Sequence, residues 1–246
     1  MRKIRPHVSL YEDIDPKVFR SFKPRKRLNP HFWTKSGKLK PAVRDDLLKI
    51  AYDFHESTGL SEDKLMDIQF SGSLANLNYS QFSDIDLDLV YDLSDLSEDA
   101  RKATEAFIQA QSKLWAERHK ISIFGHPVGL YARDQAQESI SSGVYSIMDD
   151  GWIMKPTPGE YRIDAPEVKK KANALSSEIE DIIISRDKEK MDEFWEKLRR
   201  MRTEGLRSGG EFSLLNLVFK ALRRSGDLQK LSDFEDHLYD ESLSLA

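Results

Sequence analysis

The sequence predicts a mixed α/β (α+β) fold with a small mixed sheet and a helical C-terminal part. Apolar and polar residues alternate over 66–70 and over 84–90, the pattern of strands with one buried face. Helical periodicity occupies 97–119, and short strands follow within 121–134. This order of elements is typical of an α/β unit, and helical patterns take over after Pro158.

Each predicted helix has an apolar face that we expect to be buried. The helix over 41–58 begins at Pro41 and ends before Gly59, residue types typical of those positions. Its apolar face consists of Val43, Leu47, Ile50, Ala51 and Phe54. The helix over 97–119 is expected to bury Ala103, Ala106, Phe107, Ala110, Leu114 and Trp115. Further helices are predicted over 166–186, 187–202 and 213–225.

The distribution of charge divides the chain into three parts. Residues 1–44 carry 13 Lys or Arg and 3 acids, residues 45–151 carry 8 and 20, and residues 152–246 carry 17 and 19. Together with the helix and strand patterns, this predicts a basic N-terminal extension (1–44), an α/β core (45–158) and a helical C-terminal lobe (159–246). The extension either binds a polyanion or packs against the acidic segment, and charge alone does not decide between these.

Composition excludes several classes of protein. The chain of 246 residues has no cysteine, which excludes disulfide scaffolds, thiolate nucleophiles and zinc sites built on cysteine. No stretch approaches the roughly 18 apolar residues of a membrane-spanning helix, and the N-terminus has no apolar signal-peptide core. The six histidines show no HxH or HExxH spacing. We therefore expect a cytoplasmic protein that does not bind membranes.

Catalytic chemistry is predicted in residues 70–92, FSGSLANLNYSQFSDIDLDLVYD. Asp84 and Asp86 lie two residues apart on one strand face, so their carboxylates can share a divalent cation. Mg²⁺ or Mn²⁺ is expected, because such ions bind carboxylates and leave positions for phosphate. Gly72 allows close approach of the backbone, and the Ser73 hydroxyl with nearby amides can hold phosphate oxygens. The segment therefore predicts a metal site beside a triphosphate site.

These residues resemble the signature of the DNA polymerase beta-type nucleotidyltransferase superfamily over about 20 residues. The matching positions are Phe70, Gly72, Ser73, Asp84, Ile85, Asp86 and Leu87, with Ser83 before the first aspartate. The resemblance implies an NTP donor, expected to be ATP, a pair of Mg²⁺ ions, and transfer of a nucleoside monophosphate to a hydroxyl with release of pyrophosphate. Ser83 and Ser73 would then help to bind the nucleotide.

Three other segments, LNPHFW, SSGVYS and GGEFSLLNLVFKALR, are similar to parts of uncharacterised nucleotidyltransferases encoded by tailed phages. A phage origin would place the protein in the host cytoplasm. This second resemblance indicates a lineage but does not identify a substrate.

The superfamily resemblance also implies a third carboxylate on a neighbouring strand, where it binds metal and accepts the proton of the attacking hydroxyl. By position this strand is HPVGLYARD, and Gly129 aligns with the acid. Asp134 and Asp88 are the candidates to replace it. We expect NTP and Mg²⁺ to bind, with slow or absent transfer unless one of these two carboxylates reaches the metal.

Lys220 is the predicted contact to the far end of the triphosphate, because folds of this superfamily usually place that contact on a helical lobe. The acceptor hydroxyl is left open, with RNA among the candidates because the N-terminal extension is basic. Two alternatives stand beside the enzyme. One is a catalytically silent nucleotide-binding protein, favoured by Gly129, and the other is a nucleic-acid adaptor acting through 1–44. The oligomeric state is also left open.

Overall fold

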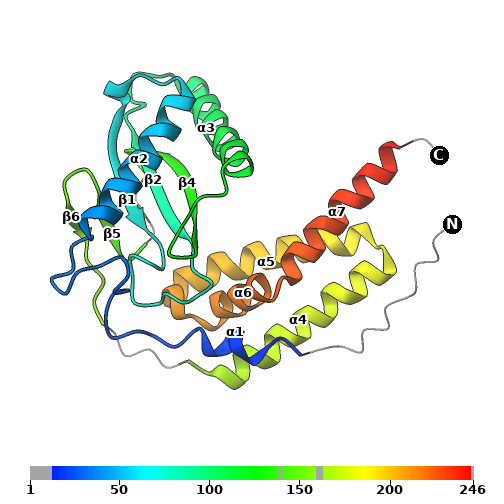
Figure 1. Ribbon diagram of the computed structural model, residues 1–246. Helices are drawn as coiled ribbons and strands as arrows, with labels where there is room; N and C mark the ends of the chain where they lie inside the picture. Colours follow the sequence, from blue (N-terminus) through cyan, green and yellow to red (C-terminus); the bar gives the residue numbers. More distant parts are fainter. Residues whose placement is uncertain (1–12, 138, 140, 159–162, 245–246) are drawn as a thin grey trace. The chain divides into compact units, whose positions relative to one another are not determined.

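The computed structural model describes residues 13–137, 139, 141–158 and 163–244. The chain divides into two compact units, Lys23–Gly159 and the pair Met1–Phe22 with Glu160–Ala246. We call these the sheet unit and the helical unit and describe each by itself (Figure 1). A mixed sheet with helices in one unit, and helices without strands in the described part of the other, confirm the predicted fold class.

The sheet unit contains a sheet with the strand order β3-β4-β2-β1-β5-β6. The strands are β1 (Leu65–Ser71), β2 (Ile85–Tyr91), β3 (Ser122–Ile123), β4 (His126–Asp134), β5 (Val144–Ser146) and β6 (Gly151–Met154). β2 and β4 are parallel, and the other neighbouring strands are antiparallel. Helix α3 (Glu98–Arg118) connects β2 to β4, because parallel neighbours need a long crossover. A short 3₁₀ turn, η1 (Glu62–Lys64), precedes β1.

One face of the sheet forms the hydrophobic core, together with helix α2 (Pro41–Thr58) and the inner side of α3. The strand side chains on this face are fully buried: Ile68, Phe70, Ile85, Leu87 and Leu89. All five residues predicted for the apolar face of α2 are buried as well. The opposite face of the sheet carries aspartates, and the candidate functional site lies on that face.

The prediction of the buried face of α3 was wrong except for Trp115, which packs against the core. On this helix Ile108 is buried and Trp115 half-buried, whereas Ala103, Ala106, Phe107, Ala110 and Leu114 are exposed. The hydroxyl of Ser112 donates to the carbonyl of Leu130 on β4, and the ring of Trp115 meets Phe54 of α2 edge-on. Ile108, Ser112 and Trp115 follow one another at helical spacing, so this mixed stripe packs on the sheet and the alanine-rich stripe lies outside.

Residues 23–40 add aromatic side chains to the core of the sheet unit. Phe32 and Trp33 are buried, and Trp33 stacks on Phe70 with 5.6 Å between ring centroids. The indole Nε1 of Trp33 donates to the carbonyl of Leu74 at 2.8 Å. Lys38 forms an ion pair of 2.9 Å with Asp150. This basic side chain therefore contacts a carboxylate of the acidic segment.

The helical unit consists of α1 (Pro16–Arg20), α4 (Ala165–Ser185), α5 (Lys188–Gly209), the 3₁₀ turn η2 (Gly210–Phe212), α6 (Leu214–Ser225) and α7 (Asp227–Leu243). Helix α7 was not expected from the sequence. Arg224 of α6 donates to the hydroxyl of Ser21 at 2.6 Å, and its guanidinium lies 4.9 Å from the ring centroid of Phe22. These contacts fix residues 13–22 to α6. Across the described residues, none of the helices combines the length and the apolar character needed to cross a bilayer.

Candidate functional site

Gly72 lies against the carboxylate of Asp86. Strand β1 ends at Ser71, and Gly72 turns the chain with φ of 70°, a left-handed conformation that favours glycine. Ser71 pairs in register with Asp86 of β2. A Cβ atom placed on Gly72 would lie 1.7 Å from Oδ2 of Asp86, so a larger residue would displace the carboxylate. The small-residue bend and the second aspartate of the predicted pair are therefore adjacent.

Asp84, Asp86 and Asp88 alternate with the core-facing residues of β2. Asp84 lies one residue before the strand begins, rather than within it as the sequence suggested. The apolar side chains between and after the aspartates are fully buried, and the three aspartates are partly exposed. The alternation is thus the predicted one, and it directs the three carboxylates to the polar face.

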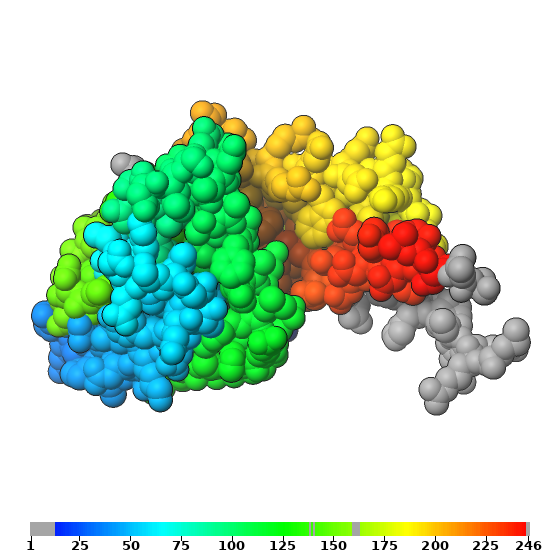
Figure 2. Space-filling view, turned by 90° about the horizontal axis from the view of Figure 1, so that it is seen from above, coloured from blue at the N-terminus to red at the C-terminus, as the bar shows by residue number. Residues whose placement is uncertain are grey.

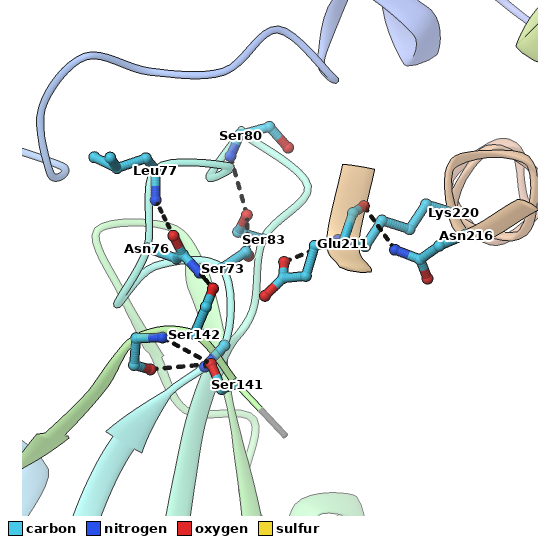
Figure 3. A network of polar contacts seen from close by, with 12 residues as sticks. Ser73, Asn76, Leu77, Ser80, Ser83, Ser141, Ser142, Glu211, Asn216 and Lys220 are labelled. Atoms are coloured by element: carbon cyan, nitrogen blue, oxygen red, sulfur yellow. Dashed lines mark hydrogen bonds and ion pairs between the residues drawn. The ribbon is translucent and has the colours of Figure 1, made fainter. Parts of the chain in front are cut away.

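The hydroxyl of Ser73 is tied to the end of the spacer between β1 and β2. Oγ of Ser73 donates to Oγ of Ser83 at 2.7 Å, and Oγ of Ser83 in turn accepts from the amide of Ser80 at 3.0 Å (Figure 3). Ser83 is only 2% exposed, and its carbonyl oxygen lies 2.6 Å from Nδ1 of His126. Ser83, the residue that precedes Asp84, therefore holds the Ser73 hydroxyl in place. A direct phosphate contact by Ser83 stays a prediction.

The loop at 141–143 also contacts the bend, which sequence reasoning missed. The amide of Gly72 donates to Oγ of Ser141 at 3.3 Å, and Nδ2 of Asn76 donates to Oγ of Ser142 at 2.6 Å (Figure 3). A Cβ on Gly143 would lie 2.1 Å from the carbonyl oxygen of Ala75. The Ser-Ser-Gly run was visible in the sequence, but nothing in it indicated that this distant loop closes over the bend.

Gly129 occupies the position next to Asp86 on the neighbouring strand. β4 runs parallel to β2, and Gly129 pairs with Asp86 while Tyr131 pairs with Asp88. A Cβ on Gly129 would lie 3.1 Å from the hydroxyl oxygen of Tyr131 and 3.2 Å from its ring. The tyrosine side chain therefore lies over the glycine, at the place where the superfamily resemblance puts a third carboxylate.

Asp134 does not reach this position. It pairs with Tyr91, is 3% exposed and belongs to the core-facing row of β4. It lies five positions after Gly129 along the strand, a span of about 16 Å. Its Oδ1 accepts the amide of Ala136 at 2.7 Å, which closes a turn after the strand. Of the two candidates to replace the third carboxylate, only Asp88 is on the same face as Asp86.

Asp88 lies in a less hydrated environment than an ordinary surface aspartate. Burial raises the pKa of its carboxyl, and a hydrogen bond from Ser71 and the positive charge of Arg133 oppose this rise. Arg133 in turn donates to Oε1 of Gln69 at 2.6 Å. A carboxylate with a raised pKa is a stronger base than a fully hydrated one. Asp88 thus lies on the same face as Asp86, in an environment that raises its pKa.

The carboxylates fit an Mg²⁺ ion that a nucleotide helps to hold. Within the described chain, no group of three or more Asp, Glu or His side chains is arranged to bind a metal. Mg²⁺ needs fewer protein ligands in phosphate-binding sites, because it keeps several waters and is commonly bound by one or two carboxylates plus substrate phosphates. Asp84 and Asp86 supply such a pair beside the Gly72 bend. These residues therefore suit a metal that is bound together with its nucleotide.

Lys220 lies on α6 in the helical unit, where it faces a carboxylate. Its ammonium is 3.4 Å from Oε2 of Glu211, and Nδ2 of Asn216 donates to the carbonyl of Glu211 at 2.8 Å (Figure 3). Burial lowers the pKa of Lys220, and the negative charge of Glu211 opposes that change. A contact between Lys220 and a triphosphate stays a prediction.

The chain matches no protein-family model and no curated protein. Among solved structures it is similar to the STING-associated CdnE c-di-GMP synthase from Capnocytophaga granulosa, with 15% sequence identity and a TM-score of 0.24. The alignment covers 85% of this chain and 70% of that one. So low a TM-score supports no conclusion about function, and the resemblances to the superfamily and to phage proteins stay predictions. The functional proposal therefore depends on the site itself.

Proposed function

We propose that this chain binds a nucleoside triphosphate with Mg²⁺ or Mn²⁺ at the Gly72 bend and transfers its nucleoside monophosphate to a hydroxyl group. The contact between Gly72 and Asp86 carries this proposal. It joins the glycine bend, where the superfamily resemblance implies the phosphates, to a carboxylate that can hold the accompanying metal. ATP is the proposed donor, on the strength of the superfamily resemblance.

The residues of the sheet unit take distinct roles in this proposal. Asp84 and Asp86 hold Mg²⁺, which when bound withdraws charge from the phosphate oxygens. Gly72 and Ser73 hold phosphate oxygens, and the proton of the Ser73 hydroxyl turns from Oγ of Ser83 to the phosphate when the nucleotide binds.

The transfer needs a group that accepts the proton of the acceptor hydroxyl. The hydroxyl oxygen forms a bond to the α-phosphorus, the bond from that phosphorus to the bridging oxygen breaks, and pyrophosphate leaves. Gly129 has no side chain to take the proton. Asp88 is the remaining carboxylate of β2 on the same face, and we assign it this role. Loss of general-base assistance typically costs about 10²–10⁴-fold in rate.

A catalytically silent nucleotide-binding protein is the second candidate. The observation that favours it is the Tyr131 side chain over Gly129, because a phenol is a weak base at neutral pH. In this case the metal and the triphosphate still bind, and no pyrophosphate is released.

The experiment that tests the first candidate measures binding and turnover on the same protein. Each NTP is titrated with Mg²⁺ or Mn²⁺ by calorimetry, and pyrophosphate release is followed with candidate acceptors. The variant Asp84→Asn with Asp86→Asn is expected to lose binding. The matched control, Asp92→Asn with Asp95→Asn beyond the opposite end of β2, should keep it. Absence of saturable binding in the natural chain contradicts both candidates, and binding without pyrophosphate release selects the silent one.

RNA is the acceptor that we propose for the active protein. Exposed basic residues lie at 23–27, and the amide of Arg25 donates to the carbonyl of Leu77 at 2.6 Å. The guanidinium of Arg25 lies 5.3 Å from the ring centroid of Tyr79. Both contacts attach this basic segment to the spacer that also carries Ser73 and Ser83. A polyanion bound there would lie close to the proposed phosphate site.

A further inference from the structure

The outer face of α3 carries an apolar stripe that no residue of the described chain covers. The stripe consists of Ala103, Ala106, Phe107, Ala110 and Leu114, all of them exposed. Phe107 keeps 47% and Leu114 keeps 49% of its surface accessible. Figure 2 looks onto this part of the sheet unit, where α3 is coloured teal to green.

This stripe has the organisation of a helix interface. Its members recur at spacings of three and four residues, so they line one side of the helix, opposite the side on which Ile108 is buried. Single exposed apolar side chains are ordinary, whereas a continuous apolar row on a polar surface indicates a contact surface. Charged residues flank the row at both helix ends.

We propose that the stripe binds the same stripe of a second copy of this chain, with the two α3 helices antiparallel. A two-fold axis level with the midpoint between Ile108 and Gln109 places two of the three alanines opposite the large residues of the stripe. Ala103 then faces the partner's Leu114, and Ala110 faces the partner's Phe107. Three alanines in the row let the two helix axes approach closely. A two-fold contact requires a surface that is complementary to itself, and this stripe has that property.

The charges at the ends of α3 match the same arrangement. Asp99 in the first turn lies level with the partner's Arg118 in the last turn, and the symmetry repeats this pair. Among the described residues, neither Asp99 nor Arg118 takes part in an ion pair, so both charges are available. A parallel pair of helices would instead place Asp99 beside the partner's Asp99. Antiparallel helices also place opposite ends of their dipoles together.

Crosslinking tests the register directly, because the natural chain has no cysteine. A chain with Ala103→Cys is mixed with a chain carrying Leu114→Cys, and the mixture is oxidised. We expect a disulfide between the two different chains, since the paired positions are adjacent. The matched control oxidises the Ala103→Cys chain alone. There the two cysteines would lie 11 residues apart along the helices, about 16 Å, which a disulfide cannot span.

Charge reversal provides a second, independent test. Asp99→Arg and Arg118→Asp are each expected to weaken dimerisation in sedimentation experiments over a concentration series, and the two changes together in one chain should restore it. Because both side chains are exposed, the fold of each variant should be unchanged by circular dichroism. A monomer at all concentrations overturns the proposal. Crosslinking of the Ala103→Cys chain to itself, or no preference for the mixed disulfide, overturns the antiparallel pairing.

Discussion

Gly72 is in direct contact with the carboxylate of Asp86. A Cβ atom on Gly72 would lie 1.7 Å from Oδ2 and 2.8 Å from Cγ of Asp86, so the glycine backbone is in contact with the carboxylate. Strand pairing enforces this contact, because Ser71 and Asp86 are partners at the end of the β1–β2 ladder. A phosphate group bound at the bend would therefore lie beside this carboxylate. The proposed metal and nucleotide sites depend on this single contact.

Gly72→Ala is expected to abolish metal-dependent nucleotide binding. The added carbon would displace the carboxylate of Asp86, and the left-handed backbone costs a further 1–2 kcal/mol or so of stability. Gly59→Ala is the matched control, because Gly59 has φ of 69° and nothing within 4 Å of an added Cβ. Urea unfolding should show a similar backbone cost in both variants, and calorimetry should show lost binding only in Gly72→Ala. Equal nucleotide affinity in the two variants would contradict the proposed site.

Gly129→Glu is expected to raise the rate of pyrophosphate release. The new carboxylate would project from β4 beside Asp86 and supply the group that the superfamily resemblance implies. General-base assistance is worth about 10²–10⁴-fold in all, and the gain is expected to be a part of this because Asp88 already supplies some of it. Since the added Cβ lies 3.1 Å from the Tyr131 hydroxyl, the tyrosine must move slightly. Tyr131→Ala alone is the control for that movement, and it should leave the rate unchanged. An unchanged rate in Gly129→Glu would mean that no acid is missing here.

Asp88→Asn is expected to stabilise the protein at neutral pH. Burial raises the pKa of Asp88 above its usual value of 3.8, so the folded chain holds its proton more tightly than the unfolded chain. This carboxyl therefore costs stability as pH rises through the window between 3.8 and its raised pKa. Asparagine cannot ionise and avoids that cost, while its oxygen can still accept from Ser71.

The urea midpoints of the Asp88→Asn variant and the natural chain should differ most at neutral pH and converge as pH falls towards 3.8. Asp53→Asn, at an exposed position of α2, serves as the control and should show no such trend. A variant less stable than the natural chain at neutral pH would show that the attraction of Arg133 outweighs the burial of Asp88.

The sequence was sufficient to predict the elements that carry local patterns. The helix over 41–58 with its apolar face and the alternation over 84–90 follow from spacing and residue type. The alignment of Gly129 with the third acid came from the superfamily resemblance, and its pairing with Asp86 is seen only in the structure. Local pattern could not predict which of two faces of α3 packs on the sheet. That choice depends on the fit of Ile108 and Ser112 to β4, whereas periodicity detects only the widest apolar stripe.

Long-range contacts could not be predicted from the sequence for a related reason. The loop at 141–143 reaches the Gly72 bend from 69 residues away, through hydroxyl groups that are common in any loop. Asp134 appeared to be a candidate metal ligand because it is close to Gly129 in sequence. Strand geometry excludes Asp134, since it lies five positions after Gly129 and an odd offset places two residues on opposite faces of a strand.

Lys26→Glu with Arg27→Glu is expected to weaken RNA binding at low salt and to flatten its dependence on salt. Both side chains are exposed in the segment that Arg25 attaches to Leu77. Each lost phosphate contact lowers the slope of log affinity against log salt by about 0.7 for a single strand. Fluorescence anisotropy with a short single-stranded RNA measures affinity and slope. The control, Lys170→Glu with Lys188→Glu, makes the same change in net charge at exposed positions of the helical unit. An equal loss in both variants would mean that the chain attracts RNA through net charge alone, and an unchanged slope in the first would exclude 23–27 as the contact.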